Sequence, residues 1–144
     1  MIRDIRPDEI HLIQDDPVRP HIGADWRIRS GKRVLVLEED DQIKAVVCVR
    51  FMDEVPASES DMKWQGINIA VFYTVWSYSP GSGRKIIQEA LKLLKSCYPY
   101  TTRAVTLSPP TDMARRFHLR NGASELRVNQ NSVNYEYDLS KQDT

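Results

Sequence analysis

The chain has 144 residues, of which 41% are hydrophobic and 28% are charged. These proportions are those of an ordinary folded domain, and they exclude a disordered chain and a membrane-spanning class. Twenty Lys and Arg balance twenty Asp and Glu, so no net charge attracts nucleic acid or an anionic bilayer. We therefore expect one domain over residues 1–144, no nucleic-acid or membrane partner, and a local site for any anion.

The only cysteines, Cys48 and Cys97, each lie in an apolar run and are expected to be buried reduced thiols. They form neither a disulfide framework nor a zinc set, so we expect no metal. No apolar run approaches the roughly 20 residues of a spanning helix, and Met1–Asp4 has no hydrophobic signal core. These features predict a cytoplasmic protein.

Three strands are predicted in the first half of the chain. The β-rich runs 33–38 and 43–51 flank the acidic segment 39–42 and read as a hairpin. Residues 67–76 are so rich in β-branched and aromatic side chains that they predict a central strand. Before residue 33 the pattern is poor: Pro7–Ile10 suggests a short helix, and Asp15–His21 an irregular loop broken by two prolines.

Helical spacing replaces strand spacing after residue 83. The spacing predicts a helix over 84–97, with one apolar face made by Ile86, Ile87, Ala90, Leu91, Leu94 and Cys97. A short strand over 104–107 follows, and Thr111 is expected to cap a second helix that ends near Asn121–Gly122. A closing hairpin is predicted from 125–128 and 133–139 across Asn129–Asn131. This order gives an α+β fold with one βαβ crossover.

A glycine turn joins the central strand to the first long helix. Gly81 and Gly83 directly precede Arg84 and Lys85 at the predicted helix start. The first amides of a helix lack internal partners and carry the positive end of its dipole, and glycine lets a phosphate approach the backbone. The other interpretation is a tight turn in which the glycines only permit positive φ.

Together with its surroundings, this turn resembles the GCN5-related N-acetyltransferases (GNATs) over residues 33–139. Their first signature is a strand, then Arg or Gln, two residues, Gly-x-Gly or Gly-x-Ala and a helix, which Gly81, Gly83 and Ile86–Ile87 match. Their second is a helix with Ala, an aromatic residue and a closing glycine pair, matched by Ala114, Phe117–His118 and Gly122–Ala123.

The resemblance implies a mixed, mostly antiparallel sheet with helices on both faces, and acetyl-CoA, or another acyl-CoA, as co-substrate. It implies that the coenzyme contacts Val75, Ser77, Tyr78, Gly81, Ser82, Gly83, Arg84 and Thr111. Tyr78 stands where the family has Arg or Gln, and Thr111 where it often has Asn. These departures affect the expected contacts to the pyrophosphate and to the pantetheine arm.

The resemblance also aligns His118 with the tyrosine that protonates the leaving thiolate. An imidazolium with a pKa near 6.5 could do the same work at neutral pH, whereas the alternative is a partly buried packing residue. The strand 67–76 has no Asp or Glu to activate an amine. Glu38, Asp53 and Glu54 lie near strand ends, but each reads rather as a solvated charge.

The leading hypothesis is therefore an N-acetyltransferase that moves an acetyl group from acetyl-CoA to a primary amine of a small molecule or protein. The alternative is a noncatalytic protein of the same fold that binds a partner or serves as a structural component. Residues 16–21 also resemble acetyltransferase-like proteins of tailed cyanobacterial phages, which would place the chain in the host cytoplasm. The sequence leaves open whether the chain is a homodimer.

Overall fold

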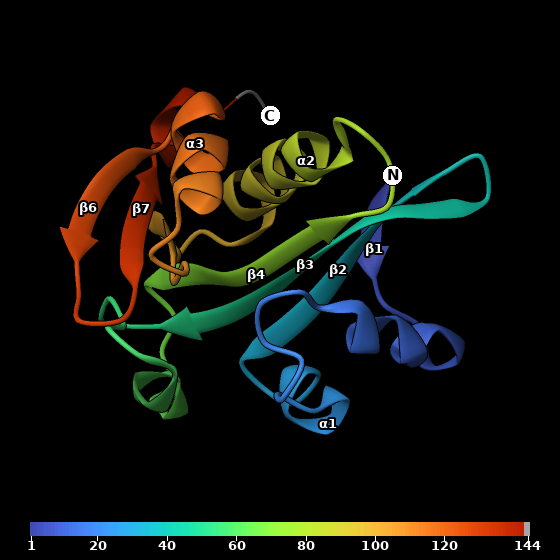
Figure 1. Cartoon of the computed structure of the whole chain (residues 1–144), viewed down its shortest axis with the longest axis horizontal. Helices are drawn as coiled ribbons and strands as arrows, with labels where there is room; N and C mark the ends of the chain where they lie inside the picture. Colours follow the sequence, from blue (N-terminus) through green and yellow to red (C-terminus); the bar gives the residue numbers. More distant parts are fainter. Residues whose placement is uncertain (143–144) are drawn as a thin grey trace.

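The computed structural model describes residues 1–142, which form a seven-stranded sheet with helices on both faces (Figure 1). The strand order is β1-β2-β3-β4-β5-β7-β6, and every pair is antiparallel except β4 and β5. The strands are β1 (Ile2–Asp4), β2 (Lys32–Glu39), β3 (Gln42–Met52), β4 (Ile69–Ser77), β5 (Arg103–Thr106), β6 (Ser124–Val128) and β7 (Val133–Tyr137). The helices are η1 (Pro7–Asp15), α1 (Ala24–Arg27), η2 (Glu59–Lys63), α2 (Ser82–Cys97), α3 (Asp112–Arg120) and η3 (Leu139–Lys141), where η marks a 3-10 helix.

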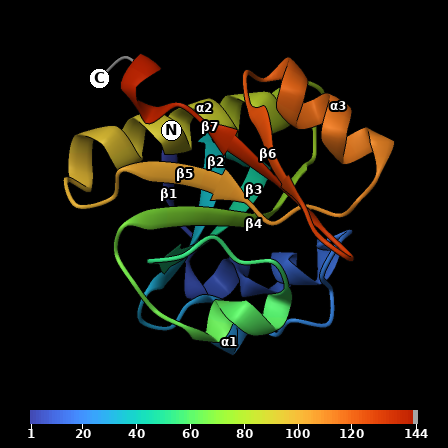
Figure 2. The same cartoon turned by 90° about the vertical axis from the view of Figure 1, so that its left-hand side faces the viewer.

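The predicted α+β class, the βαβ crossover and the helices on both faces are confirmed. Helices α2 and α3 cover one face of the sheet, and η1, α1 and η2 cover the other (Figure 2). The amphipathic pattern of α2 explains its place, since Ile86, Ile87, Ala90, Leu91 and Leu94 are all buried against the sheet. The hairpin turn at Asp40–Asp41 has positive φ at both residues, as a two-residue type I′ turn requires.

Several boundaries differ from the sequence predictions. The central strand starts at Ile69 because Asp53 Oδ1 accepts the amides of Ile67 and Asn68, at 2.9 and 3.2 Å, outside the strand ladder. Helix α2 starts at Ser82, two residues earlier than its apolar spacing indicated. The prediction that Cys97 is buried was wrong, because the thiol at the end of α2 is exposed, whereas Cys48 is buried in β3.

In the N-terminal segment the sequence pattern indicated a short helix at Pro7–Ile10, which the structure extends to Asp15, but it did not reveal the strand β1 or the helix α1. Residues 2–4 add an edge strand beside β2, and residues 7–15 form the 3-10 helix η1. None of the helices over residues 1–142 is long and apolar enough to cross a membrane.

Candidate functional site

Strand β4 parts from β5 halfway along its length. Its parallel register with β5 ends at the pair Phe72 and Thr106, although β4 continues to Ser77. A β-bulge in the pairing of β3 with β4, between Cys48 and Val49, lies beside this point, and bulges bend a strand. Residues 73–77 therefore form a stretch of β4 with no β5 partner.

The unpaired end of β4 leads into the glycine turn at the start of α2. Gly81 is the N-cap of α2 with φ +80°, a conformation that favours glycine. Within residues 1–142 the amides of Gly83 and Arg84 make no backbone hydrogen bond. Free amides at the positive end of a 16-residue helix are what an anion needs, so the turn can hold a phosphate group.

The predicted coenzyme residues are brought together around this turn. Ser77 and Arg84 are exposed, whereas Ser82 is buried and its Oγ lies 2.6 Å from Ser79 Oγ. Val75 is half-buried against the core below α2. Lys85 pairs with Glu39, so Arg84 is the nearer free cation for a ligand at the turn. Their contact with a coenzyme stays a prediction.

Tyr78 and Thr111 already make contacts within the protein. Thr111 Oγ1 accepts the amide of Ala114 at 3.2 Å, which confirms the predicted helix cap on α3. Tyr78 Oη accepts a hydrogen bond from Trp76 Nε1 and donates one to Asp15 Oδ2 at 2.7 Å. Burial, with Asp15, raises the pKa of Tyr78 to about 12, so its phenol is protonated at neutral pH.

Asp15, which sequence reasoning missed, is therefore a carboxylate that contacts the residue directly after β4. Asp15 closes η1, and only the folded chain brings it to Tyr78, 63 residues later. The carboxylates that the sequence singled out lie elsewhere. Glu38 pairs with Arg3 at 3.0 Å, and Asp53 caps the start of β4, at the opposite end from the glycine turn.

His118 lies in the core between α3 and β7. Its Nδ1 is 2.7 Å from Tyr137 Oη, and its ring stacks on Tyr135 at 5.2 Å. Burial lowers the pKa of His118 to about 4, so the ring is neutral at pH 7 and does not supply the expected imidazolium. A catalytic role for His118 would have to use a neutral N–H, and it stays a prediction.

The buried histidine makes the stability of the fold depend on pH. The folded state disfavours the charged ring, so its contribution is complete above about pH 6.5 and is lost as the pH falls toward 4. We expect the free energy of unfolding to fall by about 3 kcal/mol over this window, at about 1.4 kcal/mol per pKa unit. Urea unfolding at a series of pH values measures the loss.

Two variants control this experiment. His118→Gln keeps a partner for Tyr137 but does not titrate, so its stability should change much less between pH 6.5 and 4. His11→Gln alters an exposed histidine and should keep the wild-type slope. Equal slopes for His118→Gln and the wild type would show that the ring is not held neutral.

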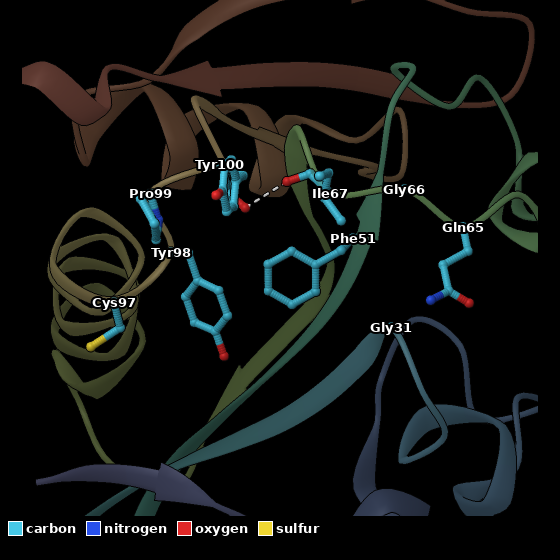
Figure 3. Close-up of a pocket in the computed structure, with 10 residues that line it drawn as sticks. Gly31, Phe51, Gln65, Gly66, Ile67, Cys97, Tyr98, Pro99 and Tyr100 are labelled. Carbon is cyan, nitrogen blue, oxygen red and sulfur yellow. Dashed lines mark hydrogen bonds between the residues drawn. The ribbon is translucent and has the colours of Figure 1, made fainter.

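A surface cavity of about 320 Å³ lies at the other end of α2, away from the glycine turn. The stacked rings of Phe51 and Tyr98, with centroids 5.1 Å apart, line the cavity, and Gly31 and Gln65 line it as well (Figure 3). This cavity is not formed by the predicted coenzyme residues. Within residues 1–142 there is also no cluster of three His, Cys, Asp or Glu that could hold a metal ion.

Comparison with known proteins gives matches to solved structures alone. No protein-family model matches the chain, and no curated protein does. A malonyl-CoA decarboxylase from Agrobacterium vitis superposes with a TM-score of 0.79 at 17% identity, covering 96% of this chain. The chain spans only 60% of that decarboxylase.

Two acetyltransferase structures match over nearly their whole length. A putative acetyltransferase of the GNAT family from Desulfovibrio desulfuricans has a TM-score of 0.68 at 14% identity, covering 96% of this chain and 98% of that one. A spermidine N-acetyltransferase chimera from Vibrio cholerae and hSSAT has a TM-score of 0.67 at 13% identity, covering 98% and 96%. With the strand order, the parting of β4 from β5 and the glycine turn that follows, these likenesses show that the chain has the GNAT fold.

Proposed function

We propose that the chain is an acyl-CoA-dependent N-acetyltransferase, which moves an acetyl group from acetyl-CoA to a primary amine. The observation that carries the proposal is the continuity of two features. Only residues 78–81 separate the stretch of β4 without a β5 partner, residues 73–77, from the start of α2, where the amides of Gly83 and Arg84 are free. One elongated ligand with a pyrophosphate at one end and a polar amide chain behind it would use both.

Each part of this surface has a chemical task. The amides of Gly83 and Arg84, the helix dipole and the Arg84 guanidinium would bind the pyrophosphate. The unpaired backbone of β4 would bind the pantetheine amides and polarise the thioester carbonyl. The amine nitrogen attacks that carbonyl carbon, the C–S bond breaks as the C–N bond forms, and the thiolate takes up the proton that the amine releases.

The acceptor would approach from the face that carries η1 and η2. Asp15 closes η1 beside Tyr78, so a carboxylate lies on this side of the sheet, whereas Glu59 at the start of η2 is already paired with Arg19 and His21. A carboxylate attracts an ammonium group and can take its proton directly or through water. A cationic amine is thus the acceptor class we propose, as in the spermidine N-acetyltransferase that shares the fold.

Calorimetric titration with acetyl-CoA, followed by an assay for free CoA thiol in the presence of spermidine, tests the proposal. We expect a micromolar dissociation constant and a thiol release that requires the amine. No binding at millimolar acetyl-CoA would contradict the proposal. Binding without turnover on any amine would favour a noncatalytic binding protein. Tyr78 and Thr111, which differ from the residues usual in GNATs at these positions, also favour that alternative.

A second candidate is decarboxylation of an acyl-CoA such as malonyl-CoA, since a malonyl-CoA decarboxylase shares the fold. The favouring observation is that β4 carries no Asp or Glu to deprotonate an amine. Decarboxylation needs no amine base, because malonyl-CoA and one proton give acetyl-CoA and carbon dioxide. Incubation with malonyl-CoA, read by mass spectrometry for acetyl-CoA, separates the two activities.

A further inference from the structure

A segment near the N-terminus contacts β4 where β5 no longer does. Three contacts span the unpaired stretch, all from residues 15–19, which we call the β4 clamp. They are Arg19 Nη1 to the Tyr73 carbonyl, Thr74 Oγ1 to Asp16 Oδ1 at 2.9 Å, and Tyr78 Oη to Asp15 Oδ2 at 2.7 Å. The first two lie one and two residues beyond the last β5 pair, Phe72.

A fully buried ion pair fixes the shape of the clamp. Asp16 Oδ2 lies 2.7 Å from Arg27 Nη1, and neither side chain is accessible to solvent. Asp16 Oδ1 also accepts the amides of Val18 and Arg19, at 2.8 and 3.0 Å, and Arg27 Nη2 donates to the Arg19 carbonyl at 2.6 Å. Hydrogen bonds therefore fix both the amide and the carbonyl of Arg19, so the backbone position from which its side chain extends is fixed.

Arg19 also joins the clamp to the other segment on this face. Its Nε lies 3.0 Å from Glu59 Oε1 at the start of η2, while its Nη1 donates to β4. The residue is only 5% exposed, so its guanidinium works in a medium where hydrogen bonds to charge are strong. One side chain thus ties the bulged point of β4 to both segments that cover the proposed acceptor side.

We propose that Arg19 is a positioning residue for acyl transfer, which keeps the unpaired stretch of β4 fixed and apart from β5. The inference rests on the proposed function, because the gap beside β4 is where the thioester would lie. A displacement of about 1 Å of a positioning group can cost on the order of 100-fold in rate. A clamp at Tyr73 and Thr74 therefore acts on kcat, whereas the glycine turn, several residues further along, governs coenzyme affinity.

Arg19→Met is the informative variant, because methionine is of similar length and the charge left behind, on Glu59, is 41% exposed and can be solvated. We expect kcat with acetyl-CoA and spermidine to fall about 10- to 100-fold, while the Kd for acetyl-CoA changes less than about twofold. Amide hydrogen exchange of residues 74–77 should become faster. Arg19→Lys should recover part of kcat, since an ammonium group can still donate to the Tyr73 carbonyl.

Two further variants make the test specific. Thr74→Val removes the hydroxyl contact to Asp16 and leaves every charge in place. It should lower kcat less than Arg19→Met does, again with little change in the Kd for acetyl-CoA. If Arg19→Met does not fold, Thr74→Val provides the test of the clamp. Thr101→Val removes a similar contact, from Thr101 Oγ1 to the Ile67 carbonyl at 2.7 Å, at the far end of β4. It should alter neither kcat nor the exchange of residues 74–77.

Wild-type kcat together with wild-type exchange in Arg19→Met would overturn the proposal. So would a kcat that falls only in proportion to the unfolded fraction. If the wild-type chain has no turnover, the proposed function fails, but hydrogen exchange still decides the clamp. Faster exchange in Arg19→Met would support it, and unchanged exchange would reject it.

Discussion

Asp16→Ala is expected to lower the free energy of unfolding by about 3–5 kcal/mol. The variant leaves the guanidinium of Arg27, which is 0% exposed, in the core without its counter-charge. It also removes the acceptor of the Val18 and Arg19 amides and of the Thr74 hydroxyl. Because a domain of this size is stable by only about 5–15 kcal/mol, urea unfolding at pH 7 should show a large shift of the midpoint.

Asp4→Ala is the matched control for this variant. Asp4 binds Arg33 through two bonds of 2.8 and 2.9 Å, so the chemistry is that of the Asp16–Arg27 pair. The Asp4 side chain is 60% exposed, however, and exposed ion pairs contribute about 0–1 kcal/mol. Equal losses of stability in the two variants would contradict the assignment of Asp16 and Arg27 to the core.

The Asp16 pair should also shape the acid limb of the stability curve. Burial acts to raise the pKa of Asp16, but the turn amides and Arg27 outweigh it and lower that pKa. A carboxyl group with a lowered folded-state pKa stabilises the fold above its unfolded pKa, near 3.9, and this contribution disappears as the pH falls further. Its loss therefore begins where that of His118 is nearly complete.

The central elements were predictable because their signal is local. Residues 69–76 are apolar or aromatic except for Thr74, as a strand buried on both faces requires, and α2 repeats its apolar residues at helical spacing. The glycine turn was predictable for the same reason, since every residue of it is adjacent in the chain. The anion site that we propose there also depends on the backbone, because the free amides of a helix start belong to the main chain.

The segment before β2 was only partly predictable, because no periodic pattern specifies it beyond the short helix indicated at Pro7–Ile10. Its elements are a strand of three residues, a 3-10 helix and a helix of four residues. Their stability comes from the Asp16–Arg27 pair, which joins residues 11 apart, and from contacts to β4 more than 50 residues away. In sequence, Asp16 before Pro17 looks like a polar loop, whereas the folded chain buries it.

The sequence also could not reveal the environment of His118. The resemblance aligns His118 with a catalytic tyrosine, but burial lowers the pKa of its ring, and two of the side chains packed on it, Tyr135 and Tyr137, come from β7. The residues of α3 alone do not show that a later strand, β7, buries the His118 ring. A motif therefore locates a residue better than it fixes its protonation state.

Gly83→Val is expected to abolish acetyl-CoA binding in calorimetric titration. A branched side chain at this position would crowd the amides of Gly83 and Arg84, where the pyrophosphate would lie. The structure adds a second effect that sequence reasoning missed: a Cβ at Gly83 would lie 3.2 Å from the ring of Phe117. Loss of binding in the single variant could therefore come from a displaced α3 as well as from a blocked turn.

Two partner variants separate these causes. Gly83→Ala adds the same Cβ against Phe117 but no branch beyond it, and the GNAT signature accepts alanine at this position, so binding should persist. Phe117→Leu, combined with Gly83→Val, removes the ring atoms that crowd Gly83 and should restore the thermal midpoint toward that of the wild type without restoring binding. If the double variant folds and binds acetyl-CoA normally, the glycine turn is a packing feature for α3, and the anion site must be sought elsewhere on the sheet.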